Sequence, residues 1–330
     1  MINNPQKIVI SRTDSIGDVA LTLPLAGILK EKYPKCKIIF LGNTYTKPII
    51  SCCNSIDEVW EWAEIQKMED SQQLNWLKDQ NVDVFIHVFP RRELARLAKR
   101  AKIQHRIGTS HRLYHFLTCN HKPNFTRKNS NLHESQLNTK LLTPFGIDKN
   151  YTLLELSNLA QFNSIKKLPS KFSDLLQTEK KNLIFHCKSQ GSALEWGVDK
   201  FIDLAKTLNV NKFNIFFTGT ESESQFFRKK LPIQTNIIDL SGQMSLDELI
   251  AFVSQAHLLL ACSTGPLHIA GLLNINTIGL YTPKKPLHFG RWQPLGEFVR
   301  IIEEKVTSPI NQPLDIELRV VKKEVESLFI

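Results

Sequence analysis

The sequence contains no long apolar run, no paired cysteine spacing and none of four common catalytic motifs. Its longest apolar runs are strand-sized, and the first residues, MINNPQKIVI, lack the apolar core of a signal peptide. We therefore expect a cytoplasmic protein. The six cysteines are scattered without the spacing of a zinc site, so we expect reduced structural thiols and no metal.

The missing motifs are GxGxxG, the Walker P-loop, HExxH and GxSxG. Their absence disfavours NAD-dependent enzymes, kinases, zinc peptidases and esterases. What is present is typical of a globular protein, since 42% of the 330 residues are hydrophobic and 22% are charged. A chain of this length exceeds the usual size of one hydrophobic core, so two domains are predicted.

Short apolar strands alternate with helical patterns along the first half of the chain. Residues 7–12, 36–42 and 82–89 have strand character, and amphipathic segments separate them. This alternation predicts parallel βαβ units. The region 106–149 is less periodic, and only residues 133–147 predict a clear helix there.

The second half repeats this pattern of elements without repeating the sequence. The predicted fold class is α/β, with two Rossmann-like domains facing a central cleft. We place the N-terminal domain at residues 1–165 and the C-terminal domain at 166–330, with the final amphipathic helix, 316–330, free to pack back on the first domain. Ligands of such sheets bind beyond the carboxyl ends of the strands, which is where the polar turns fall.

The first polar turn, residues 13–18, joins a strand to a helix. Asp18 at the start of that helix can present a carboxylate that accepts a proton from an incoming hydroxyl. An ordinary N-cap Asp is the alternative interpretation, and the two roles can coexist. Asp14 is a second candidate for the base, but its earlier place in the loop also fits a solvated carboxylate.

The stretch 258–280 carries the main candidate for a ligand site in the second half. An apolar strand ends in Ser263, Thr264 and Gly265 and passes directly into a helix. The unpaired N–H groups at such a helix start can hold a phosphate. A helix that Ser and Thr merely cap is the alternative interpretation of the same residues.

Three other turns of the second half offer polar or soft side chains. Lys188 beside Ser189 suits a diphosphate, and a surface lysine is the alternative. Glu223 at a helix start can bind ribose hydroxyls, but an acid there is also favoured by the helix dipole. Met244 can line a nucleobase pocket or simply fill the core.

Positive charge is concentrated in residues 91–128, which contain eleven Lys and Arg against one acid, Glu93. The formal net charge of the whole chain is +10, so this segment accounts for the entire excess. Its aromatics, Tyr114, Phe116 and Phe125, do not form a stacking series, and no nucleic-acid-binding module is recognisable. Phosphorylated acceptors, an anionic membrane leaflet or a solvated helical face fit the same charge.

In combination, these stretches resemble the bacterial heptosyltransferase-like glycosyltransferases, glycosyltransferase family 9, which have GT-B architecture. The resemblance spans nearly the whole chain, and the order and spacing of several stretches carry it. These are RTDSIGDVALTLPLAGILKEKYP, HCKSQGSALEWGVDKFIDLA, FTGTESE, DLSGQMSLDELIAFVSQA and STGPLHIAGLLNINTIGLYTP.

The resemblance implies a role for each candidate residue. Asp18 matches the family's Gly-Asp-Val aspartate and would be the general base for the acceptor hydroxyl, whose attack inverts the anomeric carbon and expels a nucleoside diphosphate. Preorganised N–H donors typically supply ~2.7–4 kcal/mol each in other enzymes, so no metal or other cofactor is expected. The residues implied in binding the donor, ADP-heptose or a related sugar nucleotide, are Lys188, Ser189, Glu223, Met244, Ser263, Thr264, Gly265 and His268.

The resemblance also implies a lipopolysaccharide core or another anionic glycolipid as the acceptor, bound by the N-terminal domain. This implies peripheral contact with the inner face of the inner membrane and fits the basic segment. The candidates for acceptor phosphate or carboxylate contacts are Arg91, Arg92, Arg106 and Arg112.

Two positions depart from the family pattern. Members that use ADP-heptose usually have Asp where this chain has Ser263, and often a basic residue where Glu195 precedes Trp196. The alternative hypothesis is therefore a non-catalytic nucleotide-sugar or glycan binding module on a degenerate GT-B scaffold. Nucleic acid is not among the expected partners, and binding to it would show as steeply salt-dependent association with generic duplex.

Overall fold

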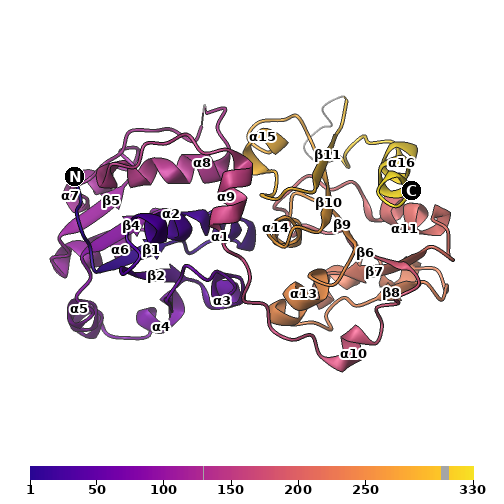
Figure 1. The fold of residues 1–330 in the computed structure, drawn as a ribbon, viewed down its shortest axis with the longest axis horizontal. Helices are drawn as coiled ribbons and strands as arrows, with labels where there is room; N and C mark the ends of the chain where they lie inside the picture. The colour runs from indigo at the N-terminus through magenta and orange to yellow at the C-terminus, as the bar shows by residue number, and fades with distance from the viewer. Residues whose placement is uncertain (129, 306–311) are drawn as a thin grey trace. The chain divides into compact units, whose positions relative to one another are not determined.

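The computed structural model describes residues 1–128, 130–305 and 312–330. The chain divides into two compact units, Met1–Ser164 and Ile165–Ile330. Each unit is built on one parallel β-sheet with helices packed against it (Figure 1). The predicted α/β fold class with two Rossmann-like domains is confirmed.

The first unit has a sheet with the strand order β3-β2-β1-β4-β5, and all its pairings are parallel. The strands are β1 (Lys7–Ser11), β2 (Lys37–Gly42), β3 (Glu58–Glu61), β4 (Val84–His87) and β5 (His105–Gly108). The helices are α1 (Ile16–Ala20), α2 (Pro24–Lys32), α3 (Lys47–Ser51), α4 (Trp62–Gln66), α5 (Asp70–Asp79), α6 (Arg92–Arg100), α7 (Leu113–Thr118), α8 (Glu134–Thr139) and α9 (Leu153–Leu159), with 3-10 turns at Thr44–Thr46 and Lys140–Phe145.

The central strands of this sheet form because their apolar runs are covered on both faces. Ile8, Val9 and Ile10 of β1 are all fully buried, as expected for a parallel strand between two layers of helices. Val9 belongs to the core beneath α5 and α6, where Leu94 and Leu97 of α6 also lie. The structure thus confirms the strands predicted near residues 7–12, 36–42 and 82–89.

The less periodic region 106–149 contains elements that the sequence pattern did not predict. Edge strand β5 and helix α7 are too short to show a clear period. The helix predicted at residues 133–147 is α-helical only as α8 and continues as a 3-10 turn. Pro144 lies inside that turn and cannot donate an α-helical hydrogen bond.

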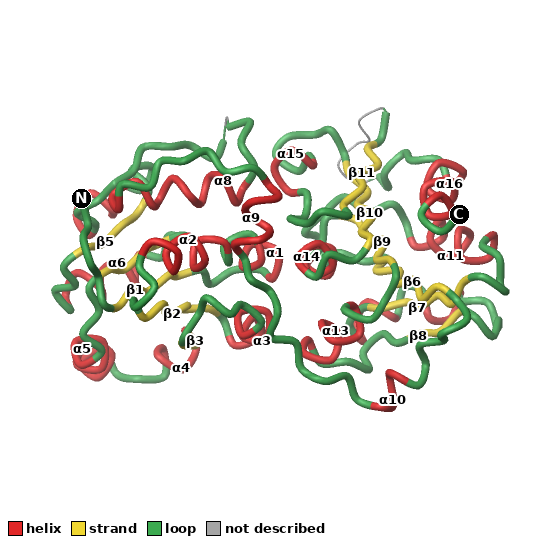
Figure 2. Tube along the Cα trace, viewed as in Figure 1, coloured by secondary structure: helices red, strands yellow, loops and turns green. Residues whose placement is uncertain are grey.

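The second unit has the strand order β11-β10-β9-β6-β7-β8, again with parallel pairings. Figure 2 shows its strands in yellow among the surrounding helices. The strands are β6 (Lys181–His186), β7 (Phe213–Thr218), β8 (Ile237–Asp239), β9 (Leu258–Cys262), β10 (Asn276–Tyr281) and β11 (Val299–Glu303). The helices are α10 (Ser170–Ser173), α11 (Val198–Thr207), α12 (Glu221–Ser224), α13 (Leu246–Val253), α14 (Gly265–Leu272), α15 (Phe289–Trp292) and α16 (Leu318–Ser327), with a 3-10 turn at Arg228–Lys230.

The last helix, α16, packs against α11 of its own unit. Its apolar side chains Val321 and Val325 are fully buried in the same core as Trp196 and Phe201. The amphipathic pattern of residues 316–330 is therefore used to cover the second sheet. Among the helices that the structure describes, none is long and apolar enough to cross a membrane.

Both sheets reverse their strand order at one point, between β1 and β4 in the first unit and between β6 and β9 in the second. The connections from these strands run to opposite sides, which leaves room for a ligand at their carboxyl ends. The turns that follow β1, β4, β6 and β9 are therefore the places where a ligand site is expected.

Gly27 provides a test of how α2 packs on α9. A Cβ atom at this position would lie 1.9 Å from the backbone oxygen of Leu159, so Gly27→Ala must force the two helices apart. We expect a loss of roughly 1–3 kcal/mol in unfolding free energy, as for other overpacked sites. Urea titration measures it, and Gly290→Ala, where only the His288 side chain is near, is the matched control. Equal unfolding midpoints for Gly27→Ala and wild type would contradict this packing.

Candidate active site

Asp18 lies in the first turn of α1, immediately after the carboxyl end of β1. The N-cap of α1 is Ser15, whose hydroxyl accepts from the Asp18 N–H at 3.4 Å and donates to Asp18 Oδ2 at 2.6 Å. The alternative interpretation of Asp18 as an N-cap is therefore wrong. Its side chain remains one-fifth exposed, so the carboxylate is both held in place and accessible.

The other oxygen of Asp18 is held by Arg12, the residue that follows β1. The Arg12 side chain is only 5% exposed and forms ion pairs with Asp18, with Asp14 at 2.8 Å and with Glu134 at 3.4 Å. Glu134, at the start of α8, also binds Arg127 at 2.5 Å. Burial alone would lower the pKa of Arg12, but the three carboxylates together raise it above its ordinary value.

Asp14 occupies a different environment from that of Asp18. The pKa of Asp14 is raised to about 6, mainly because burial disfavours its charged form more than the attraction of Arg12 favours it, and the nearby charge of Asp18 contributes to the rise. The Tyr45 hydroxyl donates to the Asp14 backbone oxygen at 2.5 Å and fixes the loop from outside. The interpretation of Asp14 as a fully solvated carboxylate is not supported, because most of its side chain is buried.

The four arginines predicted to contact an acceptor do not form one cluster. Arg91 follows β4 and donates Nη2 to the Thr13 backbone oxygen at 2.9 Å and Nε to its hydroxyl, so it braces the loop that carries Asp14 and Asp18. Arg92 begins α6 and is exposed, and Arg112 is exposed at the N-cap of α7.

Arg106 is placed differently from the other three arginines. Its guanidinium donates to the backbone oxygens of Ile103 and Thr118, the latter at 2.7 Å. These hydrogen bonds tie strand β5 to the segments before and after it. The structure therefore gives Arg106 a structural role that the charge pattern did not indicate.

In the second unit, the turn after β6 is organised around Glu195. The Glu195 carboxylate binds the Lys188 ammonium at 2.5 Å, and it accepts from the Ser189 N–H at 2.8 Å and the Ser189 hydroxyl at 2.9 Å. The Lys188 ammonium also lies 4.6 Å from the centroid of the Phe226 ring. Lys188 is thus held at the strand end by an internal counter-charge.

The turn after β9, next to β6 in the sheet, has unpaired donors. Thr264 is the N-cap of α14, and in the described parts of the chain its backbone N–H, that of Gly265 and its buried hydroxyl have no hydrogen-bond partner. The His268 N–H donates to the Thr264 backbone oxygen at 3.4 Å, and the His268 side chain is buried. The interpretation of Thr264 as a simple side-chain cap is wrong, since its hydroxyl makes no cap hydrogen bond.

Ser263 lies between the end of β9 and the N-cap of α14 and is half-buried. The Tyr281 hydroxyl at the end of the adjacent strand β10 donates to the Trp292 backbone oxygen at 2.7 Å. A serine at position 263 adds no charge to the turn.

Glu223 and Met244 follow the next two strands of the sheet, β7 and β8. Glu223 is buried, and its Oε2 accepts from the Thr220 N–H at 2.7 Å in the capping box of α12. Met244 is half-buried directly before Ser245, the N-cap of α13. The sheet order therefore places all the predicted donor residues along one edge, in the strand sequence β9, β6, β7, β8.

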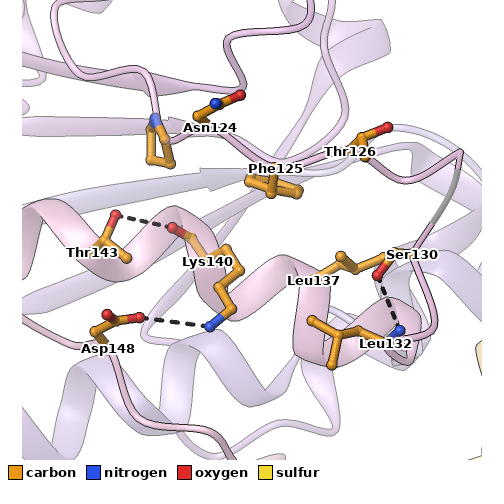
Figure 3. Close-up of a pocket in the computed structure, with 10 residues that line it drawn as sticks. Asn124, Phe125, Thr126, Ser130, Leu132, Leu137, Lys140, Thr143 and Asp148 are labelled. Carbon is orange, nitrogen blue, oxygen red and sulfur yellow. Dashed lines mark hydrogen bonds and ion pairs between the residues drawn. The ribbon is translucent and has the colours of Figure 1, made fainter.

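A separate cavity of about 440 Å³ opens beside α8 in the first unit (Figure 3). Apolar side chains of Phe125, Leu132 and Leu137 line it together with Lys140 and Asp148, whose charged groups are 3.6 Å apart. The five charged residues of the Arg12 network do not line the cavity as far as the structure describes it. This cavity is therefore distinct from the strand-end turns, and Lys140, the cation among its described lining residues, is paired with Asp148.

The structure adds site residues that the motifs did not identify. Arg12 and Glu134 are 122 positions apart in sequence and meet only in the fold. The one feature of the sequence that could have indicated Arg12 was its position directly after an apolar strand.

Comparison with known proteins identifies the class to which this arrangement belongs. The model of glycosyltransferase family 9 (heptosyltransferase) matches residues 74–312. A putative glycosyltransferase of Haemophilus influenzae is 27% identical over 88% of this chain and 87% of its own length. The lipopolysaccharide core heptosyltransferase OpsX of the same organism is 21% identical over 94% and 88%. The structure of Escherichia coli heptosyltransferase WaaC with ADP has a TM-score of 0.73 and 18% identity, covering 98% of this chain and 99% of that one.

The fold is the GT-B fold of heptosyltransferases, and the family match makes the chain a glycosyltransferase. The chain belongs to glycosyltransferase family 9. Both the family and the fold class that the sequence predicted are confirmed.

The raised pKa of Asp14 predicts a pH-dependent stability. A carboxyl with a higher pKa in the folded chain than in the unfolded chain stabilises the fold at low pH, and this contribution is lost as pH rises through about 6. Asp14→Asn cannot titrate, so its melting temperature relative to wild type should rise between about pH 4 and pH 7. Scanning calorimetry across this range measures the difference. Exposed Asp79→Asn is the control, and a flat difference for Asp14→Asn would contradict the raised pKa.

Proposed function

We propose that this protein is an inverting, metal-independent glycosyltransferase that transfers a heptose or related sugar from a nucleoside-diphosphate donor to a lipopolysaccharide core or similar anionic glycolipid. The observation that carries the proposal is the fixed, accessible carboxylate of Asp18 at the strand-order reversal of the first sheet. At the corresponding place in the second sheet, the N–H groups of Thr264 and Gly265 have no hydrogen-bond partner among the described residues.

Asp18 acts as the general base in this proposal. Ser15 and Arg12 hold its two oxygens, so the carboxylate keeps one orientation while part of it stays open to an acceptor hydroxyl. It removes the proton as that hydroxyl attacks the anomeric carbon, and the bond to the nucleoside diphosphate breaks on the opposite face. Such proton transfer typically contributes 10²–10⁴-fold in rate.

The turn after β9 holds the leaving diphosphate. The N–H groups of Thr264 and Gly265 at the start of α14 point their partial positive charge at this position, and the Thr264 hydroxyl adds a further donor. Lys188 supplies a full charge from the adjacent strand end. These fixed donors supply the charge stabilisation that a metal ion provides in other transferases.

The identity of the nucleotide and the sugar is inferred from the residues at the same edge of the second sheet, where its strands end. The E. coli relative WaaC was solved with ADP, which supports ADP as the leaving group here, with Glu223 at the ribose and Met244 beside the base. Ser263 presents a hydroxyl and no charge at this turn, so the sugar is recognised here by neutral hydrogen bonds. The acceptor side uses Arg92 and Arg112, the two exposed members of the predicted arginines.

A second candidate function is a non-catalytic sugar-nucleotide binding module. It is favoured by the Lys188–Glu195 ion pair, which neutralises the cation proposed to bind the diphosphate. Both candidates place the protein in the cytoplasm at the inner face of the inner membrane. They differ in whether Asp18 supports turnover.

Asp18→Asn should reduce sugar transfer by at least about 100-fold, because the amide cannot accept the acceptor proton. Transfer from ADP-heptose to a lipopolysaccharide core acceptor is measured, together with the thermal shift caused by ADP. The thermal shift should be unchanged, which separates lost chemistry from lost binding. Asp79→Asn, on the exposed face of α5, is the control. Near-normal transfer by Asp18→Asn would show that another group is the base, and no transfer by wild type would favour the binding module.

Lys188→Met should weaken ADP binding by about tenfold, which is the usual effect of losing a charged hydrogen bond. Glu195→Gln should instead tighten it, because the Lys188 charge is then no longer neutralised. Calorimetric titration with ADP, UDP, GDP and CDP measures both effects and the base preference. Lys229→Met, an exposed lysine of the same unit, is the matched control. If none of the four nucleotides binds wild type, the donor site proposed here is wrong.

A further inference from the structure

Helix α7 exposes the side of its surface that a globular protein normally buries. Leu113, Phe116 and Leu117 have exposed fractions of 88%, 58% and 74%. Their i, i+3, i+4 spacing places them on one face of the helix. Apolar residues at this spacing usually face the core, so these three form an apolar ridge directed at solvent.

The opposite face of α7 is anchored firmly in the first unit. His115 is fully buried, its Nδ1 lies 2.8 Å from the Thr109 backbone oxygen, and its ring centroid is 5.9 Å from that of His87 at the end of β4. A Cβ atom on Gly108 would lie 2.6 Å from the same ring. The ridge is therefore a feature of a packed helix and not of a frayed segment.

Basic side chains surround this ridge. The Lys122 ammonium lies 5.7 Å from the Phe116 ring centroid, and Arg112 is exposed at the N-cap. Helix α6 packs beside α7 (Figure 1) and exposes Arg96 and Lys99, for which no ion pair occurs within the described residues. Glu93 is the only acid in residues 91–128, so this segment places an excess of positive charge beside an apolar centre.

We propose that α7 is a membrane-docking element that inserts Leu113, Phe116 and Leu117 into the headgroup region of an anionic lipid bilayer. An apolar helix face bordered by Lys and Arg binds such bilayers through burial of apolar area and attraction to anionic lipid. This deepens the membrane contact in the proposed function and rests on that function only for the identity of the acceptor.

A second copy of this chain fits the surface poorly. A two-fold symmetric contact would place the same basic residues opposite one another, and like charges repel. The exposed area of three side chains is also far below the ~800 Å² per partner that a stable protein interface buries. A bilayer needs no matching partner surface and supplies the opposite charge.

The position of α7 relates membrane docking to the candidate active site. The loop into α7 follows the carboxyl end of β5, and Asp18 follows the carboxyl end of β1, with only β4 between the two strands. Neighbouring strands are about 4.8 Å apart, so the two strand ends are about 10 Å apart on the same edge of the sheet. Docking through α7 therefore brings the edge of the first sheet where the strands end, and with it Asp18, close to the lipid headgroups.

The test is cosedimentation with vesicles of phosphatidylcholine alone and of phosphatidylcholine with an equal amount of phosphatidylglycerol. Wild type should bind the anionic vesicles, and the double variant Phe116→Ser with Leu117→Ser should bind them roughly 10- to 100-fold more weakly, given the apolar area no longer buried. The matched control combines Val210→Ser and Ile233→Ser, two exposed apolar residues of the second unit, and should bind like wild type. Arg96→Gln with Lys99→Gln should weaken binding to anionic vesicles only.

A fluorophore reports insertion directly. All six native cysteines are buried, so a label on Leu117→Cys is selective, and its emission should shift to the blue when anionic vesicles are added. The same label on Ile233→Cys should not shift. Three results would each overturn the proposal: unchanged vesicle binding by the Phe116/Leu117 double variant, no emission shift at position 117, or no binding of wild type to anionic vesicles. The last result would leave a protein as the partner of the ridge.

The outcome is separable from the proposed enzyme function. Transfer to a water-soluble, delipidated acceptor saccharide should be the same for wild type and the Phe116/Leu117 double variant. Loss of vesicle binding with normal transfer supports docking alone, whereas normal vesicle binding without transfer contradicts only the enzyme function. A melting temperature equal to that of wild type confirms that the double variant is folded.

Discussion

The buried guanidinium of Arg12 is the interaction on which the candidate base of the first unit depends. An isolated cation in this position would cost several kcal/mol in lost hydration. The three carboxylates of Asp14, Asp18 and Glu134 offset that cost, and Arg127 completes the network from the far side of Glu134. The network ties the end of β1 to α8, so the orientation of Asp18 depends on tertiary packing as well as on its own helix.

In the second unit, the cation at the strand end is balanced by a single carboxylate. Glu195 balances Lys188 within one turn and also accepts two hydrogen bonds from Ser189. The next residue, Trp196, donates its N–H to the sulfur of Cys262 at 3.2 Å and thereby links this turn to the end of β9. Glu195, the acidic residue before the tryptophan, is thus part of the edge of the sheet where the strands end. There it fixes the position of the Lys188 ammonium and neutralises its charge.

Much of the fold was predictable because long, regular patterns carry it. The buried strands β1, β2, β4, β6 and β9 are continuous apolar runs, and the parallel topology follows from their alternation with helices. Short elements were not predictable, since β5 and α7 are four and six residues long. The charge pattern identified the basic segment, but it did not separate the exposed Arg92 from Arg106, whose guanidinium binds backbone oxygens.

By itself, the sequence determined the fold class, the family and the turns that carry candidate side chains, because these depend on local order and spacing along the chain. Only the tertiary structure decided which charges meet. It brought Glu134 to Arg12, paired Lys188 with Glu195 and turned the apolar face of α7 outward. Arg12 and Glu134 lie on different elements, and even the pairing of Lys188 with Glu195 within one turn depends on distance in space, as do the energies of ion pairing and burial, which local sequence patterns do not contain.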